Sequence, residues 1–386
     1  MRQADEFPPV RPWVAWTASR IQDPLWRLRY LHCVASPPAR VSAWKSRKTL
    51  GLLAVIALGL VVAPWSLRMH GAAKDESSTL PPLPALPMPH FAPPDAPAPD
   101  VWLVEKTKQF ETYSNGLRID DQYAASNRPR SYVAFSLADP SGNSGEKRSR
   151  PAGIVYHTTE SLQAPFESSQ NSVLKRVGES LLDYVRRRRC YNFMIDRFGR
   201  VFRVVQESDA SDHAGHSVWA DNQYFYVNLN DSFLGVSFEA QTGAGGSAGA
   251  GGGGGIAGQA QLRAAAMLTE MLRSRYGIPA GNCVTHAQVS VNPSNMRVGY
   301  HTDWASSFPF EALGLPDNYA TPSPAVYLFG FVSDAVFQQH AGGRMAGAAV
   351  EAERAVASQA AAAHLKPSVY RKALQKRFWK IQGHRG

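Results

Sequence analysis

The chain has 386 residues, and 44% of them are hydrophobic, which is enough for a sizeable core and for two or three domains. Its formal charge of +10 comes from the two ends. Residues 1–48 carry nine Lys and Arg against three acids, residues 344–386 carry nine against two, and the 295 residues between them sum to −3. This distribution argues against a basic nucleic-acid-binding face on the central part, so we expect no nucleic acid as a partner.

An apolar segment follows the basic N-terminus. Residues 49–67, TLGLLAVIALGLVVAPWSL, contain no charged side chain, and a helix of this length spans roughly 28 Å, enough to cross a bilayer core. Four Lys or Arg lie at positions 40–48, whereas only Arg68 and Lys74 follow closely. We therefore predict a transmembrane helix or signal anchor, with residues 1–48 in the cytoplasm and the later residues on the periplasmic or cell-wall side of the cytoplasmic membrane. The alternative, a secretory signal cut near HGAA, would also export the rest.

The exported part divides into three regions. Residues 68–100 form a Pro-rich linker, a semi-extended spacer without a core of its own. A folded domain is expected over residues 101–320, interrupted by a flexible Gly-rich insertion at 243–258. Residues 321–386 form a helical, basic extension. Its last helix, after Pro367, is amphipathic, and its apolar side could lie on an anionic surface or dock onto the folded domain.

The folded domain alternates short strands with longer helices. In chain order the pattern predicts a buried strand at 152–157, a helix at 168–189 ending in RRRR, a hairpin at 191–205, a strand at 233–240, a helix at 262–276 and a short strand at 283–286. This order predicts an α/β fold, a central mixed β-sheet flanked by helices. Cys190 and Cys283 share the exported side, where a disulfide and two buried free thiols are both open.

Three side chains of this domain form a candidate metal site. His157 ends the strand GIVYH, His286 ends CVTH, and Asp303 follows in the next loop. Two strands of one sheet that both end in His can bring the imidazoles together, and the carboxylate would complete three ligands around Zn²⁺. The fourth position would remain open for water.

Five motifs then occur in a characteristic order: IVYHTTES, CYNFMIDRFGRVFRVV, DHAGHSVW, SFLGVSFEA and RYGIPAGNCVTHAQVS with GYHTDW. Over about residues 150–320 they resemble the zinc-dependent N-acetylmuramoyl-L-alanine amidase family, which includes phage-type amidases and peptidoglycan recognition proteins. The resemblance implies the fold of that family and assigns His157, His286 and Asp303 as its zinc ligands.

The resemblance also implies roles for further residues. His301 stands where the family often has a catalytic Lys, and Tyr191 matches a tyrosine beside the reacting water. His213 matches a motif that lines the substrate groove. Where some branches have a Glu as base, this chain has Ser237, and Glu239 two residues later is expected to be an ordinary surface carboxylate.

The expected function is therefore zinc-dependent hydrolysis of the amide bond between N-acetylmuramic acid and L-alanine, with peptidoglycan or muropeptides as substrate. The membrane would be a partner through the N-terminal helix. The alternative is a module that binds muropeptides without cutting them. Non-catalytic members of such families usually lose a zinc ligand, whereas all three are present here, which favours the enzyme.

Overall fold

The computed structural model describes residue 83 and residues 96–161, 163–242 and 257–383. The predicted transmembrane segment, the basic segment before it, most of the Pro-rich linker and residues 243–256 of the Gly-rich insertion lie outside these residues. Among the helices within the described ranges, none is long and apolar enough to cross a membrane.

The described residues form fifteen strands and eight α-helices. The strands are β1 (Leu103–Lys106), β2 (Phe110–Tyr113), β3 (Arg118–Asp120), β4 (Tyr132–Ser136), β5 (Gly145–Arg148), β6 (Gly153–Thr158), β7 (Phe193–Ile195), β8 (Val201–Arg203), β9 (Val218–Ala220), β10 (Tyr224–Val227), β11 (Phe233–Phe238), β12 (Cys283–Thr285), β13 (Val291–Asn292), β14 (Arg297–Val298) and β15 (Val332–Ser333). The helices are α4 (Asn171–Arg188), α5 (Leu229–Ser232), α6 (Gln259–Tyr276), α7 (His286–Val289), α8 (Pro324–Phe329), α9 (Ala335–Gln338), α10 (Gly343–Ala362) and α11 (Pro367–Gly383).

The largest sheet has eight strands in the order β1-β2-β3-β8-β7-β11-β6-β12. The pairs of β11 with β6 and β7, and of β6 with β12, are parallel, whereas β7 and β8 form the antiparallel hairpin that the sequence predicts. The prediction of a mixed α/β fold is therefore confirmed. Two smaller sheets have the orders β5-β4-β10-β9 and β13-β14-β15.

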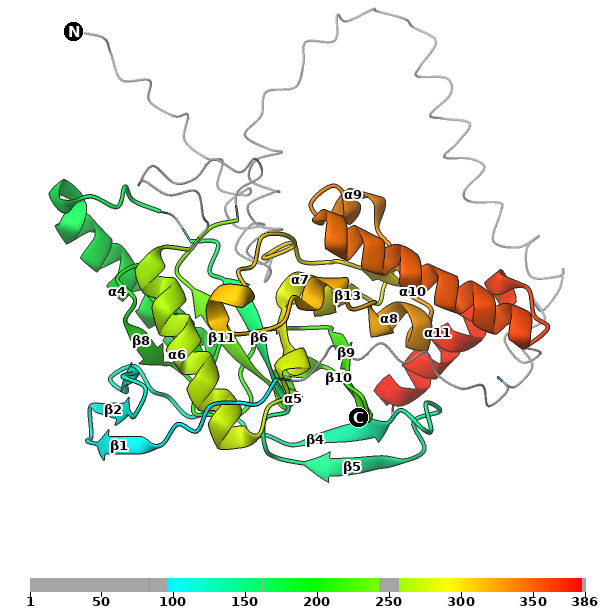
Figure 1. The fold of residues 1–386 in the computed structure, drawn as a ribbon, viewed down its shortest axis with the longest axis horizontal. Coiled ribbons are helices and arrows are strands. Elements are labelled where there is room, and N and C mark those ends of the chain that lie inside the picture. Colours follow the sequence, from blue (N-terminus) through cyan, green and yellow to red (C-terminus); the bar gives the residue numbers. More distant parts are fainter. Residues whose placement is uncertain (1–82, 84–95, 162, 243–256, 384–386) are drawn as a thin grey trace, which may run out of the picture. The chain divides into compact units, whose positions relative to one another are not determined.

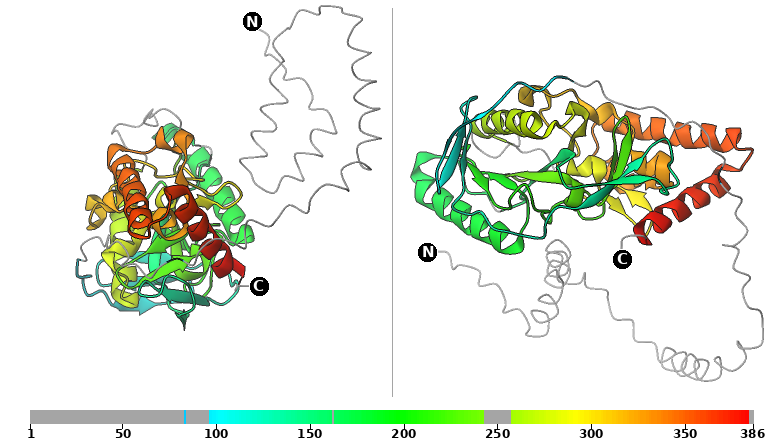
Figure 2. Two further views of the ribbon diagram at one scale, coloured as in Figure 1. Left: turned by 90° about the vertical axis from the view of Figure 1, so that its right-hand side faces the viewer. Right: turned by 90° about the horizontal axis from the view of Figure 1, so that it is seen from below.

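Helices α4 and α6 cover opposite faces of this sheet (Figure 2). Alternate residues of β7 point to opposite sides, as the strand period requires. Phe193 and Ile195 join the core that contains Leu268 of α6, while Met194 joins the cluster that contains Leu182 of α4. Helices α4 and α6 are thus each fixed to one face of the sheet. The candidate site lies at the carboxyl ends of β6 and β12.

The C-terminal extension docks on the rest of the fold. Helices α8, α10 and α11 pack on one another, and α8 contacts β9 (Figure 1). The apolar side of α11 is buried in this core at Tyr370, Leu374, Phe378 and Ile381. Of the two possibilities for the amphipathic tail, docking onto the folded domain is therefore confirmed, because the apolar side is already covered by protein.

Cys190 and Cys283 do not form a disulfide with each other. Cys283 is fully buried in β12, and Cys190 is half-buried just after α4. Burial raises the pKa of the Cys190 thiol to about 11. The free-thiol alternative therefore holds over the disulfide.

Candidate active site

The two predicted ligand histidines lie together because their strands are direct neighbours. β12 pairs with β6 in parallel, with Thr285 opposite Tyr156. The next residue of each segment, His286 and His157, therefore lies at the same end of the sheet, and the two ring centroids are 4.5 Å apart. Asp303 comes from the loop after β14 and places its carboxylate against both rings.

The geometry of these three side chains fits a metal ion. The Asp303 carboxylate lies 2.9 Å from Nδ1 of His286 and 3.3 Å from Nδ1 of His157. One ligand atom from each residue lies within 4.8 Å of the others, and all three residues are buried. Tetrahedral zinc with ligand bonds of about 2.0–2.2 Å holds neighbouring ligand atoms about 3.3–3.5 Å apart. The two distances from the carboxylate to the imidazoles are close to this spacing, so the cluster can hold zinc after a small adjustment.

The cluster also leaves one nitrogen without a bond. Nε2 of His286 is buried and has no hydrogen-bond partner among the residues that the structure describes. Buried polar atoms are almost always paired, so such an atom indicates a ligand or a strained site. The unpaired nitrogen lies in the ring that stacks on His301, with centroids 4.2 Å apart.

The charges in the cluster are those that metal binding requires. Burial alone would raise the pKa of Asp303, but the electrostatic effect of the neighbouring His286, and the contacts of the carboxylate with both imidazoles, hold it well below its usual range. Burial lowers the pKa of His157 to about 4, and the neighbouring His286 adds to the effect. At neutral pH the site therefore holds a carboxylate beside a neutral His157, a donor set suited to zinc.

The two predicted catalytic residues flank this cluster. The ring centroid of Tyr191 lies 5.1 Å from that of His157, and the Tyr191 backbone is left-handed at φ 62°. Burial raises the pKa of its hydroxyl well above the usual value, so the hydroxyl keeps its proton. Burial, and then His286, lowers the pKa of His301 to about 3, so this imidazole is neutral at pH 7.

His213 lies directly behind His157. Its Nδ1 is 3.0 Å from Nε2 of His157, and its Nε2 is 3.3 Å from the carbonyl oxygen of Phe233. The side chain is buried, with 8% of its surface exposed. The substrate-binding role expected for His213 stays a prediction, and the geometry adds a contact with a candidate ligand that the sequence did not reveal.

Ser237 in β11 and Glu239 just after it lie where a carboxylate base was considered in the sequence. Ser237 lies opposite His157 in the parallel register, fully buried. Glu239 is not the surface carboxylate that we expected, because only 4% of it is exposed. Burial raises the pKa of Glu239 to about 7. The backbone N–H of Arg197 donates to Oε2 at 3.2 Å, and this hydrogen bond lowers the pKa in part. The expectation is wrong because two segments distant in sequence, the turn after β7 and helix α4 at Gly178, close over the strand end.

The structure also reveals Arg130, which carried no signal in the sequence. Within the part of the chain that the structure describes, its buried guanidinium donates to backbone carbonyls, those of Glu207, Asp209, Asp231 and Phe233. The carbonyl of Phe233 is the one that also faces His213. A single Arg between a proline and a serine resembles any surface cation, so only the folded chain could identify it.

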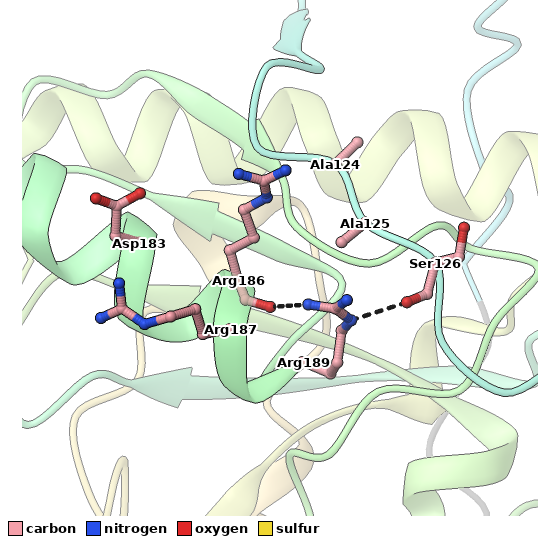
Figure 3. A pocket seen from close by; sticks show the side chains of 7 residues that line it. All are labelled: Ala124, Ala125, Ser126, Asp183, Arg186, Arg187 and Arg189. Carbon is pink, nitrogen blue, oxygen red and sulfur yellow. Dashed lines mark hydrogen bonds between the residues drawn. The ribbon is translucent and has the colours of Figure 1, made fainter.

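A separate cavity of about 570 Å³ lies at the C-terminal end of α4, away from the predicted site (Figure 3). It is lined by Ala124, Ala125, Ser126, Asp183, Arg186, Arg187 and Arg189. Arg189 crosses it, donating to the carbonyls of Ser126 and Arg186. Its guanidinium thus closes the end of the helix, and none of the predicted ligands or catalytic residues lines this cavity.

Comparison with known proteins finds a match over the region that contains the candidate site. Residues 147–303 match the family model described as N-acetylmuramoyl-L-alanine amidase, Amidase_2. The match includes the motifs that carry the resemblance and ends at the candidate ligand Asp303. No curated protein matches the chain.

Several solved amidases are similar to it at low identity. The E. coli amidase AmiD, solved with anhydro-N-acetylmuramic acid-L-Ala-D-gamma-Glu-L-Lys, is 18% identical over 61% of this chain and 92% of its own, with a TM-score of 0.33. AMPDH3 from Pseudomonas aeruginosa, in complex with anhydromuramic pentapeptide, is 17% identical over 59% and 91%, with a TM-score of 0.32. LysC from Clostridium intestinale is 17% identical over 50% and 93%, with a TM-score of 0.27.

Proposed function

Because residues 147–303 belong to the N-acetylmuramoyl-L-alanine amidase family, we propose that this protein is a zinc-dependent enzyme that hydrolyses the amide bond between N-acetylmuramic acid and L-alanine in peptidoglycan or muropeptides. The observation that carries the zinc dependence is the buried cluster of His157, His286 and Asp303. Two histidines and one carboxylate are a common ligand set of catalytic zinc, which keeps its fourth position for water.

The chain's own residues have distinct tasks in this proposal. His157, His286 and Asp303 hold the metal, which when bound polarises the scissile carbonyl and acidifies water. Tyr191 keeps its hydroxyl proton at neutral pH, so it can donate a hydrogen bond to the carbonyl oxygen as negative charge develops there. His301 begins neutral, so the N–H of its imidazole can donate a hydrogen bond to the developing oxyanion.

Neither Ser237 nor Glu239 is assigned as the base in this scheme. Ser237 replaces the Glu of other branches and cannot accept a proton at neutral pH. Glu239 has a pKa near 7, but its carboxylate contacts the Arg197 backbone and lies near Gly178 of α4.

The proposal includes a cellular location for the protein. The charge-free segment 49–67 with its basic N-terminal flank supports a single-pass protein of the cytoplasmic membrane, with the amidase domain on the periplasmic or cell-wall side. Intact wall would then be within reach of the domain.

The test is metal analysis of the pure protein together with an assay on purified sacculi. We expect about one zinc per chain and release of stem peptides with a free N-terminal L-alanine, both lost after removal of the metal with a chelator and restored by zinc. Binding of sacculi without release of peptide would favour the non-catalytic alternative. A pure protein that neither contains nor takes up zinc would refute the proposal.

A further inference from the structure

The arrangement around His213 determines where the protons of two imidazoles lie. A carbonyl oxygen only accepts hydrogen bonds, so the 3.3 Å contact with Phe233 requires a proton on Nε2 of His213. The His213 ring is buried, and the Arg130 guanidinium donates to the same carbonyl at 2.9 Å. A second positive charge at this position is unfavourable, so His213 is neutral and its Nδ1 carries a lone pair.

The proton of His157 follows from that lone pair. Nε2 of His157 lies 3.0 Å from Nδ1 of His213, so His157 must be the donor in this bond. Neutral His157 then has its proton on Nε2 and a lone pair on Nδ1. That lone pair faces the Asp303 carboxylate at 3.3 Å. Two acceptors at this distance repel each other unless a cation lies between them.

Three further features of the fold hold His213 in this place. Oδ1 of Asn230 accepts hydrogen bonds from the backbone N–H groups of His213, Ala214 and Gly215, which fixes the loop. Gly235 on β11 leaves room for the ring, because a Cβ there would lie 2.6 Å from Cγ of His213. Arg130 fixes the carbonyl that the ring contacts. Such a set of restraints exceeds what packing of a single loop histidine needs.

We propose that His213 is a positioning residue, which holds His157 as the Nε2–H tautomer and directs its Nδ1 lone pair toward the place between His157 and Asp303 where a metal binds. This inference rests on the proposed zinc function. A second residue that accepts the far N–H of a ligand histidine fixes the ring and makes the ligating nitrogen more basic, and its loss typically weakens metal binding about 10–100-fold.

The experiment uses the full-length protein and three variants. His213→Leu removes the acceptor, whereas His213→Asn keeps an oxygen near the position of Nδ1. His216→Leu makes the same change at an exposed histidine of the same loop. Nitrogen NMR of histidine-labelled, metal-free protein reports the tautomer of His157, and competition with a chromophoric chelator gives the dissociation constant for zinc.

We expect the Nε2–H tautomer of His157 in the wild-type protein and in His213→Asn, and mixed tautomers in His213→Leu. Zinc should bind His213→Leu about 10–100-fold more weakly than wild type, while His213→Asn recovers most of the affinity and His216→Leu equals wild type. An Nδ1–H tautomer in wild type, or unchanged zinc affinity in folded His213→Leu, would overturn the role. If His213→Leu does not fold, the wild-type spectrum and His213→Asn still decide. If wild type binds no zinc, the proposed function fails, while the tautomer measurement judges His213 separately.

Discussion

Replacing Glu239 by Gln should make stability less dependent on pH. The carboxyl is 96% shielded from solvent, and its pKa is raised from 4.5 to about 7, mainly by burial. An acid with a raised folded-state pKa binds its proton more tightly in the folded protein than in the unfolded chain. The folded protein therefore loses stability as pH rises from about 4.5 through 7. At about 1.4 kcal/mol per pKa unit, the charged form destabilises the fold by about 3 kcal/mol above pH 8.

Gln has nearly the same shape as Glu and can still accept the Arg197 N–H, so the variant removes the charge and keeps the contact. We expect Glu239→Gln to match wild type in urea unfolding at pH 4.5 and to exceed it by up to about 3 kcal/mol at pH 8. The control is Glu105→Gln on the exposed edge strand β1, which should follow wild type at both pH values. If the difference between Glu239→Gln and wild type is the same at pH 4.5 and pH 8, the carboxyl is not buried as described.

Three other outcomes are expected. His286→Ala should lose both zinc and hydrolysis, whereas Tyr191→Phe should keep zinc and lose about 10²–10³ in kcat, as for removal of one oxyanion donor; equal loss of zinc in both would contradict the role of Tyr191. A chain ending at residue 365 should unfold or aggregate, since Tyr370, Leu374, Phe378 and Ile381 each stabilise the core by about 1.5–3 kcal/mol; a stable, monodisperse product with a cooperative thermal transition would refute this. A reporter fused after residue 100 should be active only outside the cytoplasm, and activity inside would reverse the topology.

The sequence by itself determined the elements around the site, because strand and helix patterns are local. The buried strand ending in His157, the hairpin that follows Tyr191 and the strand before His286 are each defined by a few neighbouring residues. The residue types of the cluster were also visible, since two histidines at strand ends and a carboxylate in a loop form a recognisable metal-binding pattern. The helix at 262–276 was likewise predicted from apolar spacing alone, and in the structure it begins at Gln259.

Only the tertiary structure decided which of these residues meet and which lose contact with water. His213 is 56 positions from His157, yet the two rings form a hydrogen bond. Arg130 reaches four carbonyls of two distant segments, and Glu239 becomes a buried acid beneath α4. The apolar face of α11 was equally compatible with a membrane surface until its packing partners were known. Desolvation and long-range hydrogen bonds depend on the segments that pack around a residue, and the pattern of its neighbours in sequence does not contain that information.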